Sequence, residues 1–181
     1  RELLGESDKA ILALKKAFKA NDASPYIASA LAKFYLRGNK ISHAREVLEK
    51  LLATQSSEKN CNGLLGKIIS KYYPDEANKA LIYFRRSFTK GDSNYFNQFW
   101  FARQLYVMRK FEDATIAFKE LGKEPIDLYT KRIIRGILSE NGNLIQLKGK
   151  ITKLETTYAF ALNTKYPGIH FIHKENIDES V

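Results

Sequence analysis

The sequence predicts a mainly α protein in which helical hairpins stack as a right-handed solenoid and a small β-region follows. Three observations predict this fold. The apolar residues of the first two thirds follow a helical period, a repeat of about 34 residues runs through the same part, and apolar and polar residues alternate near the end. We therefore expect a helical-repeat domain over residues 1–124 and a β-rich segment over residues 125–181.

The repeat is clearest in four alanines, each of which is followed four residues later by a large apolar residue. The alanines lie 34, 36 and 34 residues apart. A small residue precedes the last three alanines by 12, 14 and 12 residues, at positions 32, 66 and 102. The longer spacing falls where Pro74 and two extra residues lengthen a predicted turn, so the packed faces keep their period. The four pairs are Ala10 with Leu14, Ala44 with Leu48, Ala80 with Phe84, and Ala114 with Phe118.

This pattern resembles the tetratricopeptide repeat (TPR) over about residues 7–122. The TPR consensus has Leu-Gly and an aromatic residue on its first helix, then Ala and Phe on its second. The resemblance implies that small residues let helices approach closely, and that large residues fill the space between successive hairpins. It also implies that the first helices line a concave groove where ligands bind. The first segment contains only a second helix.

A basic residue follows the small residue of three successive repeats, at Lys33, Lys67 and Arg103. Equivalent positions should line up along the predicted groove, and Arg37 would widen the resulting ladder of positive charge. The functional interpretation is a groove for an acidic protein segment. The alternative is an ordinary solvated face of a basic protein.

The segment "SNYFNQFWFARQLYVMRKF" carries more aromatic residues than one narrow apolar stripe can hold. Phe96, Phe99 and Tyr106 share a helical face with Arg103, which predicts an aromatic wall of the same groove. Packing between repeats is the alternative interpretation of these rings.

Strand signals begin after Pro125. Asn141-Gly142 is a strong two-residue hairpin signal between segments rich in Ile and Leu. The segments "GKITKLETTYAF" and "IHFIHKENI" follow, with a loop or turn containing Pro167 and Gly168 before the second. The sequence therefore predicts a β-hairpin and further strands.

These strand segments resemble the first part of the cold-shock domain, a small OB-type barrel that stacks bases on exposed rings. The matching residues are Gly149-Lys150-Ile151, Tyr158-Ala159-Phe160 and Phe171-Ile172-His173. The resemblance implies a partial barrel that binds single-stranded nucleic acid. The alternative is a β-appendage that caps the last repeat. The residues expected to bind nucleic acid are Lys150, Lys153, Tyr158, Phe160, Phe171 and His173.

Composition limits the classes of function. No run of 18 apolar residues is present, so we expect no membrane association and a cytoplasmic protein. The single cysteine and three histidines show no metal-ligand spacing, and we expect no metal and no cofactor. The net charge of +10 favours an anionic partner.

No phosphate loop, nucleophile elbow or paired carboxylates are recognisable, so we do not expect an enzyme. The leading hypothesis is a non-catalytic interaction module that binds a protein segment, an acidic one being favoured, or another domain of its parent chain. The alternative is RNA or single-stranded DNA binding through the β-segment. By analogy, that segment would serve as the sensor region of a multidomain signalling NTPase.

Overall fold

The computed structural model describes residues 2–134, 139–140, 143–144, 148–164 and 169–173. The helical part contains α1 (Glu2–Ala20), α2 (Pro25–Arg37), α3 (Ile41–Thr54), α4 (Lys59–Tyr72), the short 3₁₀ helix η1 (Pro74–Glu76), α5 (Ala77–Arg86), α6 (Tyr95–Val107), α7 (Phe111–Gly122) and α8 (Leu128–Ile133). The strands are β1 (Ser139–Glu140), β2 (Asn143–Leu144), β3 (Lys150–Leu154), β4 (Tyr158–Leu162) and β5 (Ile169–His173).

Local sequence explains where helices begin and turn. Ser24 precedes Pro25 at the start of α2, and its hydroxyl accepts a hydrogen bond from the Ile27 amide at 3.4 Å. Asn39 and Arg109 occupy the equivalent left-handed position in the turns after α2 and α6, with φ angles of 55° and 61°. These turns reverse the chain sharply, so each first helix lies against its second helix.

The helices pack as the repeat predicts. They form three hairpins, α2 with α3, α4 with α5, and α6 with α7, and α1 packs on α2 as a second helix that precedes them. Ala44, Ala80 and Ala114 are buried. Leu48 and Phe84 are fully buried, whereas Leu14 and Phe118 are only partly covered or exposed. These two lie in the outermost helices of the repeats, which have a repeat neighbour on one side only.

Gly66 shows why a small residue is needed on the first helix. A Cβ atom at this position would lie 2.8 Å from Cδ1 of Phe84, closer than packed carbon atoms approach. Gly63 is equally constrained, because a Cβ atom there would lie 2.6 Å from Oδ1 of Asn97 on α6. Glycine therefore allows α4 to approach both α5 and α6 closely.

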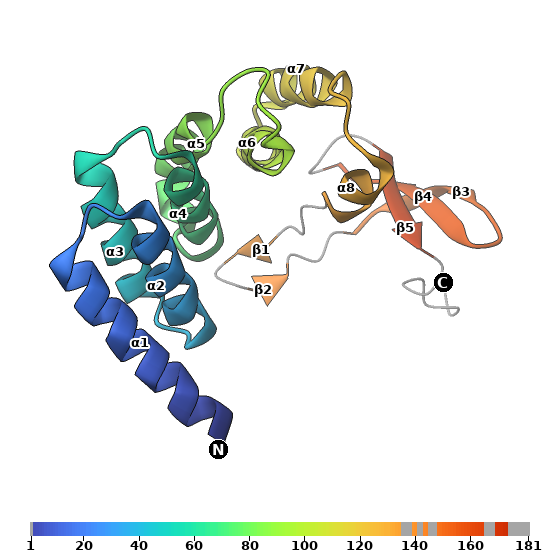
Figure 1. Ribbon diagram of the computed structural model, residues 1–181. Coiled ribbons are helices and arrows are strands. Elements are labelled where there is room, and N and C mark those ends of the chain that lie inside the picture. The colour runs from blue at the N-terminus through green and yellow to red at the C-terminus, as the bar shows by residue number, and fades with distance from the viewer. Residues whose placement is uncertain (1, 135–138, 141–142, 145–147, 165–168, 174–181) are drawn as a thin grey trace.

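The helices form an arc (Figure 1). The first helices α2, α4 and α6 lie on its inner side, and the second helices α3, α5 and α7 lie on its outer side. η1 contains Pro74 in the turn between α4 and α5, where the sequence predicted an insertion that leaves the packed faces intact.

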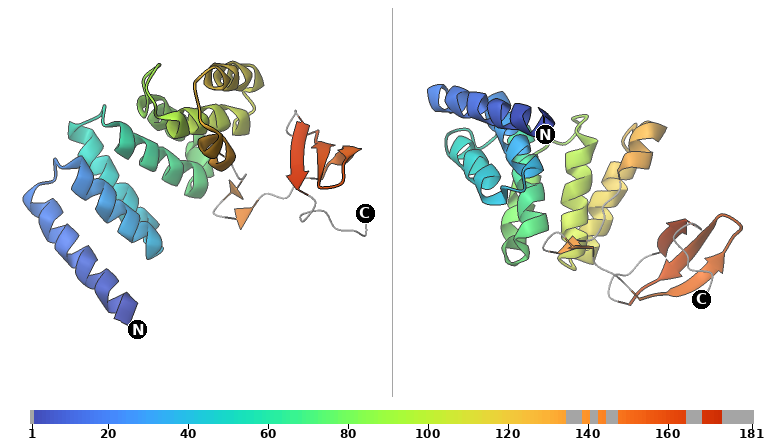
Figure 2. Two further views of the ribbon diagram at one scale, coloured as in Figure 1. Left: turned by 45° about the vertical axis from the view of Figure 1, so that its right-hand side comes forward. Right: turned by 90° about the horizontal axis from the view of Figure 1, so that it is seen from below.

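The C-terminal part contains two small antiparallel sheets. β1 pairs with β2, with Glu140 opposite Asn143, which confirms the predicted hairpin pairing, although Asn141 and Gly142 lie outside the described residues. β3, β4 and β5 form a second sheet in that order. Figure 2 shows this sheet at the end of the arc opposite α1. An OB-type barrel is not confirmed, since β3, β4 and β5 form a three-stranded meander that pairs with no further described strand.

One helix was not predicted. α8 begins at residue 128, inside the segment that the sequence analysis assigned to β-structure. Its start is explained by Asp127, whose carboxylate accepts a hydrogen bond from the Thr130 amide at 2.9 Å. The capping signal was present in the sequence, but the six-residue helix is too short for a clear apolar period.

Candidate functional site

The candidate site lies on the three first helices, which form the inner side of the arc and which carry the predicted basic residues. Ala32 and Ala102 are fully buried, as Gly66 is, in the contacts between helices. The next residue on each helix is turned by about 100°. Lys33, Lys67 and Arg103 therefore occupy equivalent positions beside the packed seam.

Trp100 of α6 is the centre of this surface. The Lys67 Nζ atom lies 5.4 Å from the centroid of its ring, and the Arg103 guanidinium carbon lies 4.8 Å from it. Both distances are within the range of cation–π attraction, so the indole ring holds two cations close together. The Trp100 ring also stacks on Phe84, with centroids 6.1 Å apart, which joins the surface to the core.

Electrostatics distinguish the three basic residues. Lys33 is exposed, Lys67 is half-buried, and Arg103 is 6% exposed. Burial lowers the pKa of Lys67, and the nearby positive charge of Lys33 lowers it further. An anion placed here would relieve the repulsion between the two lysines. The three predicted basic residues therefore differ in their exposure to solvent and do not form a row of equally solvated charges.

We name the set of Lys33, Lys67, Trp100 and Arg103 the inner basic cluster. Trp100 was not among the residues predicted for the site from the sequence. Its position three residues before Arg103, one turn away on the same helix, was the signal that could have found it. The contact between Trp100 and Lys67 joins two different helices, so spacing within one helix does not reveal it.

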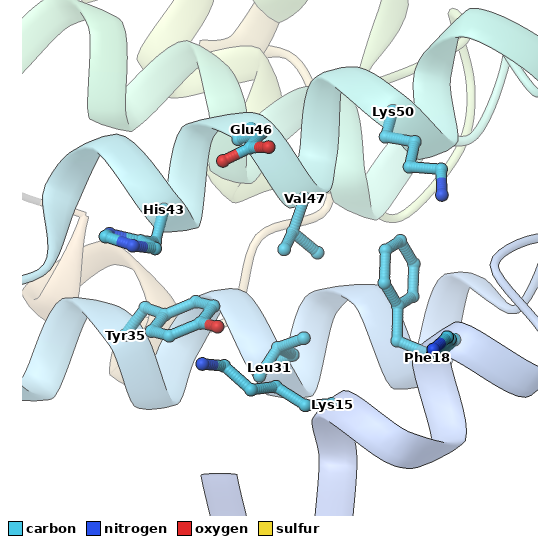
Figure 3. A pocket seen from close by; sticks show the side chains of 9 residues that line it. Lys15, Phe18, Leu31, Tyr35, His43, Glu46, Val47 and Lys50 are labelled. Carbon is cyan, nitrogen blue, oxygen red and sulfur yellow. The ribbon is translucent and has the colours of Figure 1, made fainter. Parts of the chain in front are cut away.

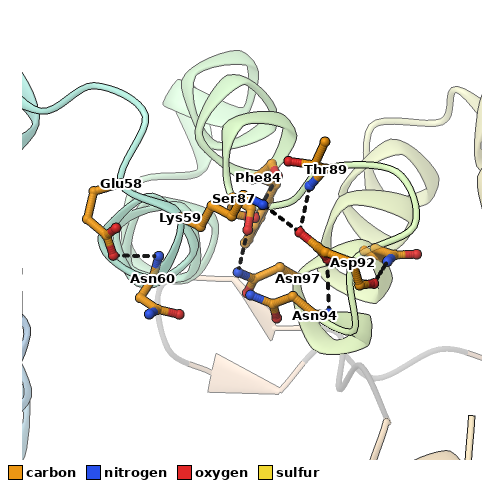
Figure 4. Close-up of polar contacts among 10 residues, drawn as sticks. Glu58, Lys59, Asn60, Phe84, Ser87, Thr89, Asp92, Asn94 and Asn97 are labelled. Carbon is orange, nitrogen blue, oxygen red and sulfur yellow. Dashed lines mark hydrogen bonds and ion pairs between the residues drawn. The ribbon is translucent and has the colours of Figure 1, made fainter.

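Polar contacts hold α6 in register with α4 (Figure 4). The Lys59 ammonium of α4 donates to the Asp92 carboxylate at 2.8 Å, and this carboxylate also accepts from the Thr89 and Asn94 amides. Burial raises the pKa of Asp92, but these donors outweigh it and the net pKa is lowered. The contacts order the segment between α5 and α6 and so position the inner basic cluster.

Two buried amides extend this support. Asn97 donates to the Ser87 carbonyl at 2.9 Å. Gln104 accepts from the Ser70 hydroxyl at 2.7 Å and donates to the Ala77 carbonyl at 3.2 Å. Hydrogen-bonded amides at a helix interface specify one arrangement of the helices.

The other residues predicted for the groove divide into two groups. Arg37 is exposed and lies over the Phe34 ring of its own helix at 5.4 Å, and Phe96 is 38% exposed. Packing accounts for the other two. The Phe99 ring lies 6.0 Å from Phe118, and the Tyr106 ring lies 5.4 Å from Phe111, both on α7.

The inner side of the arc also faces part of the chain itself. β1 lies beside α4. Figure 1 shows the β1 and β2 strands within the curve of the helices. An extended segment of this chain therefore already runs next to the first helices.

The second predicted site lies on the three-stranded sheet. Tyr158 and Phe160 are half-buried neighbours on β4, with ring centroids 5.5 Å apart. Residues 173 and 171 stand opposite them in the strand register, but the side chains of Phe171 and His173 lie outside the described residues. Lys150 and Lys153 are exposed, and the Lys153 ammonium pairs with Glu155 at 2.7 Å. Four of the six predicted residues thus lie on the adjacent strands β3 and β4, and their side chains are among those that the structure describes.

The hairpins give the chain a TPR-like helical-repeat fold. No family model matches the sequence. The TPR repeat-containing protein MJ1428 of Methanocaldococcus jannaschii is 25% identical over 162 residues, which cover 83% of this chain. The chain spans 28% of the length of that relative.

Solved structures show the same fold. A crystal structure of MamA is similar with a TM-score of 0.56 and 21% identity, covering 66% of this chain and 69% of that one. MamA of Desulfovibrio magneticus RS-1 is similar with a TM-score of 0.53 and 14% identity, covering 72% of this chain and 70% of that one. A Podosopora anserina putative kinesin light chain with TPR-like repeats is similar with a TM-score of 0.50 and 16% identity, covering 67% of this chain and 68% of that one.

Two further features bear on the chemistry of the described part of the chain. Its helices include none with the length and apolar character required to cross a bilayer. Within the same residues, His, Cys, Asp and Glu side chains form no group of three suited to a metal ion.

Proposed function

We propose that this chain is a non-catalytic interaction module whose inner basic cluster binds an acidic segment of a partner protein. A TPR-like fold is typical of protein-interaction scaffolds. The observation that carries the proposal is Trp100 with Lys67 and Arg103 on its ring, and Lys33 of α2 close enough for its charge to act on Lys67.

The cluster offers two kinds of contact to such a segment. Carboxylates would form charge-assisted hydrogen bonds with the lysine ammoniums, which are stronger than neutral hydrogen bonds. The ring of Trp100 and the partly exposed Phe96 would cover the apolar stems of the segment. Binding would also favour the charged form of Lys67, whose pKa is lowered in the free protein.

Charge removal at the cluster tests the proposal. Lys33→Glu combined with Lys67→Met removes two cations, while methionine retains an apolar stem over Trp100. We expect the affinity for an extended glutamate-rich peptide to fall at least tenfold, because two charge contacts are lost. Trp100 is the single tryptophan of the chain, so its fluorescence reports binding at this surface directly.

Lys119→Glu is the control, since Lys119 is exposed on α7. This single reversal lowers the net charge by two units, and the double variant lowers it by three. We expect this variant to bind as the wild type does. An equal loss of affinity in both variants would show attraction by net charge alone. Thermal unfolding should be unchanged in the double variant, and a large fall in its midpoint would assign the lysines a structural role.

A second candidate function is single-stranded nucleic-acid binding by the three-stranded sheet. The observation that favours it is the adjacent pair of partly exposed rings, Tyr158 and Phe160, beside the exposed Lys153. Such rings stack on bases regardless of sequence. In this case the chain would serve as the nucleic-acid-sensing region of a larger signalling NTPase.

Oligonucleotide titrations test this candidate. We expect salt-sensitive binding of a labelled oligothymidylate, weakened roughly tenfold by Tyr158→Ala, because stacking on one ring contributes about 1–3 kcal/mol. Leu154→Ala is the control, since Leu154 is 67% exposed and pairs in register with Ala159, on the alternate face from Phe160. The absence of binding at low salt would eliminate the candidate.

A further inference from the structure

A groove opens between the second helices α1 and α3, on a different face from the inner basic cluster. Its cavity has a volume of about 260 Å³ and an apolar floor of Phe18, Leu31, Tyr35 and Val47. Leu31 and Tyr35 lie one turn apart on one face of α2, whereas Lys33 lies between them and points to another face. A ligand in this groove would therefore not touch the inner basic cluster.

Cations stand at both ends of this groove (Figure 3). The Lys15 Nζ atom lies 5.6 Å from the centroid of the Tyr35 ring, and the Lys50 Nζ atom lies 5.7 Å from that of Phe18. His43 lines the groove with its ring 5.3 Å from Tyr35. The described residues that line the groove include three lysines, Lys15, Lys19 and Lys50, and one carboxylate, that of Glu46.

Elsewhere along the stack a cation is neutralised within the protein. Between α3 and η1 the Arg45 guanidinium donates to both carboxylate oxygens of Glu76, at 2.7 and 2.9 Å. Among the lysines that line the groove, Lys50 pairs with the exposed Asp22 at 3.1 Å. The ion pairs between described residues include neither Lys15 nor Lys19. Lys15 and Lys19 are therefore not neutralised by an ion pair within the described part of the chain, and their charges would attract an anionic ligand.

We propose that the groove between α1 and α3 is a second binding site, which takes an acidic peptide segment carrying one large apolar side chain. The volume lies below the roughly 300–1,000 Å³ of pockets that enclose whole small molecules, and it suits a single anchoring side chain. The apolar floor receives that side chain, and Lys15, Lys19 and Lys50 bind carboxylates on either side of it. This site goes beyond the proposed function, because it lies on the outer helices and serves a second contact.

The test uses a labelled glutamate-rich peptide with one central phenylalanine and a matched peptide with alanine in its place. Binding is measured by fluorescence anisotropy in the Lys33→Glu, Lys67→Met background, which silences the inner basic cluster. We expect the phenylalanine peptide to bind at least fivefold more tightly than the alanine peptide. We also expect no change in Trp100 fluorescence, since Trp100 lies on α6.

Lys15→Glu should weaken binding of the phenylalanine peptide roughly tenfold, because it replaces attraction by repulsion at the rim. Lys16→Glu is the matched control, since Lys16 is the exposed neighbour that does not line the groove. Equal losses in the two variants, or equal affinity of the two peptides, would overturn the proposal. If the wild-type protein bound anionic lipid vesicles and neither peptide, the proposal would also be overturned. Each result is independent of whether the inner basic cluster binds its own ligand.

Discussion

Phe84→Ala is expected to lower the free energy of unfolding by about 3–5 kcal/mol, the range for truncation of a fully buried phenylalanine. Phe84 is 0% exposed, fits against Gly66 of α4 and stacks on Trp100 of α6. Its removal leaves a cavity where three helices meet, and the surrounding helices can close it only in part. Urea unfolding followed by circular dichroism measures the loss.

Ile82→Ala is the control for this prediction, because Ile82 lies on the same helix and is 51% exposed. We expect it to change the free energy of unfolding by less than about 0.5 kcal/mol. A loss below about 1.5 kcal/mol for Phe84→Ala would contradict the role of this ring as the wedge between repeats. A smaller slope of the unfolding free energy against urea concentration would show that the repeats unfold separately, since each repeat contacts only its neighbours.

Glu76→Gln is expected to destabilise the protein by about 1–2 kcal/mol at pH 7, because it breaks a half-buried bidentate ion pair. The Glu76 carboxylate accepts from Arg45 of α3 and from Lys79 of α5, and so it joins two successive hairpins. The Arg45 guanidinium also lies 4.6 Å from the centroid of the Tyr73 ring, which holds it in place. Chemical unfolding at a series of pH values measures the effect.

The pH dependence follows from the direction of the shift. Hydrogen bonds from Arg45 and, to a smaller extent, from Lys79 lower the pKa of Glu76 from its ordinary value of 4.5 to about 2. The stabilisation is therefore complete above the ordinary pKa and is lost as the pH falls from about 5 towards 2. We expect the difference in the free energy of unfolding between wild type and Glu76→Gln to shrink over this range. Glu46→Gln on the exposed surface of α3 should show no such convergence, and a constant difference for Glu76→Gln would contradict the assignment.

The helical part could be predicted from sequence because its signals are local. Ala44 and Ala80 are each followed four residues later by a large apolar residue, Leu48 or Phe84, and the burial of all four confirms that the repeat marks packed positions. The short α8 was missed, because six residues give too little periodicity to outweigh the strand signals that follow. The cold-shock resemblance rested on short strand motifs, which do not specify whether a sheet closes into a barrel.

The candidate site was predicted in part. The positions of Lys33, Lys67 and Arg103 follow from the repeat, because equivalent residues of stacked hairpins line up. Their different exposures do not follow from it. Phe99 and Tyr106 were interpreted as wall residues with packing as the alternative, and their contacts with Phe118 and Phe111 favour packing.

The sequence by itself determined the helices of the repeats, the order in which they pair and the positions where small residues are required. These depend on residues within one helix or one hairpin, where helical geometry converts spacing into direction. The tertiary structure alone decided that Lys67 and Arg103 share the ring of Trp100, and that a groove remains between α1 and α3. Both depend on how closely separate helices approach, which is set by the combined shapes of side chains from several repeats.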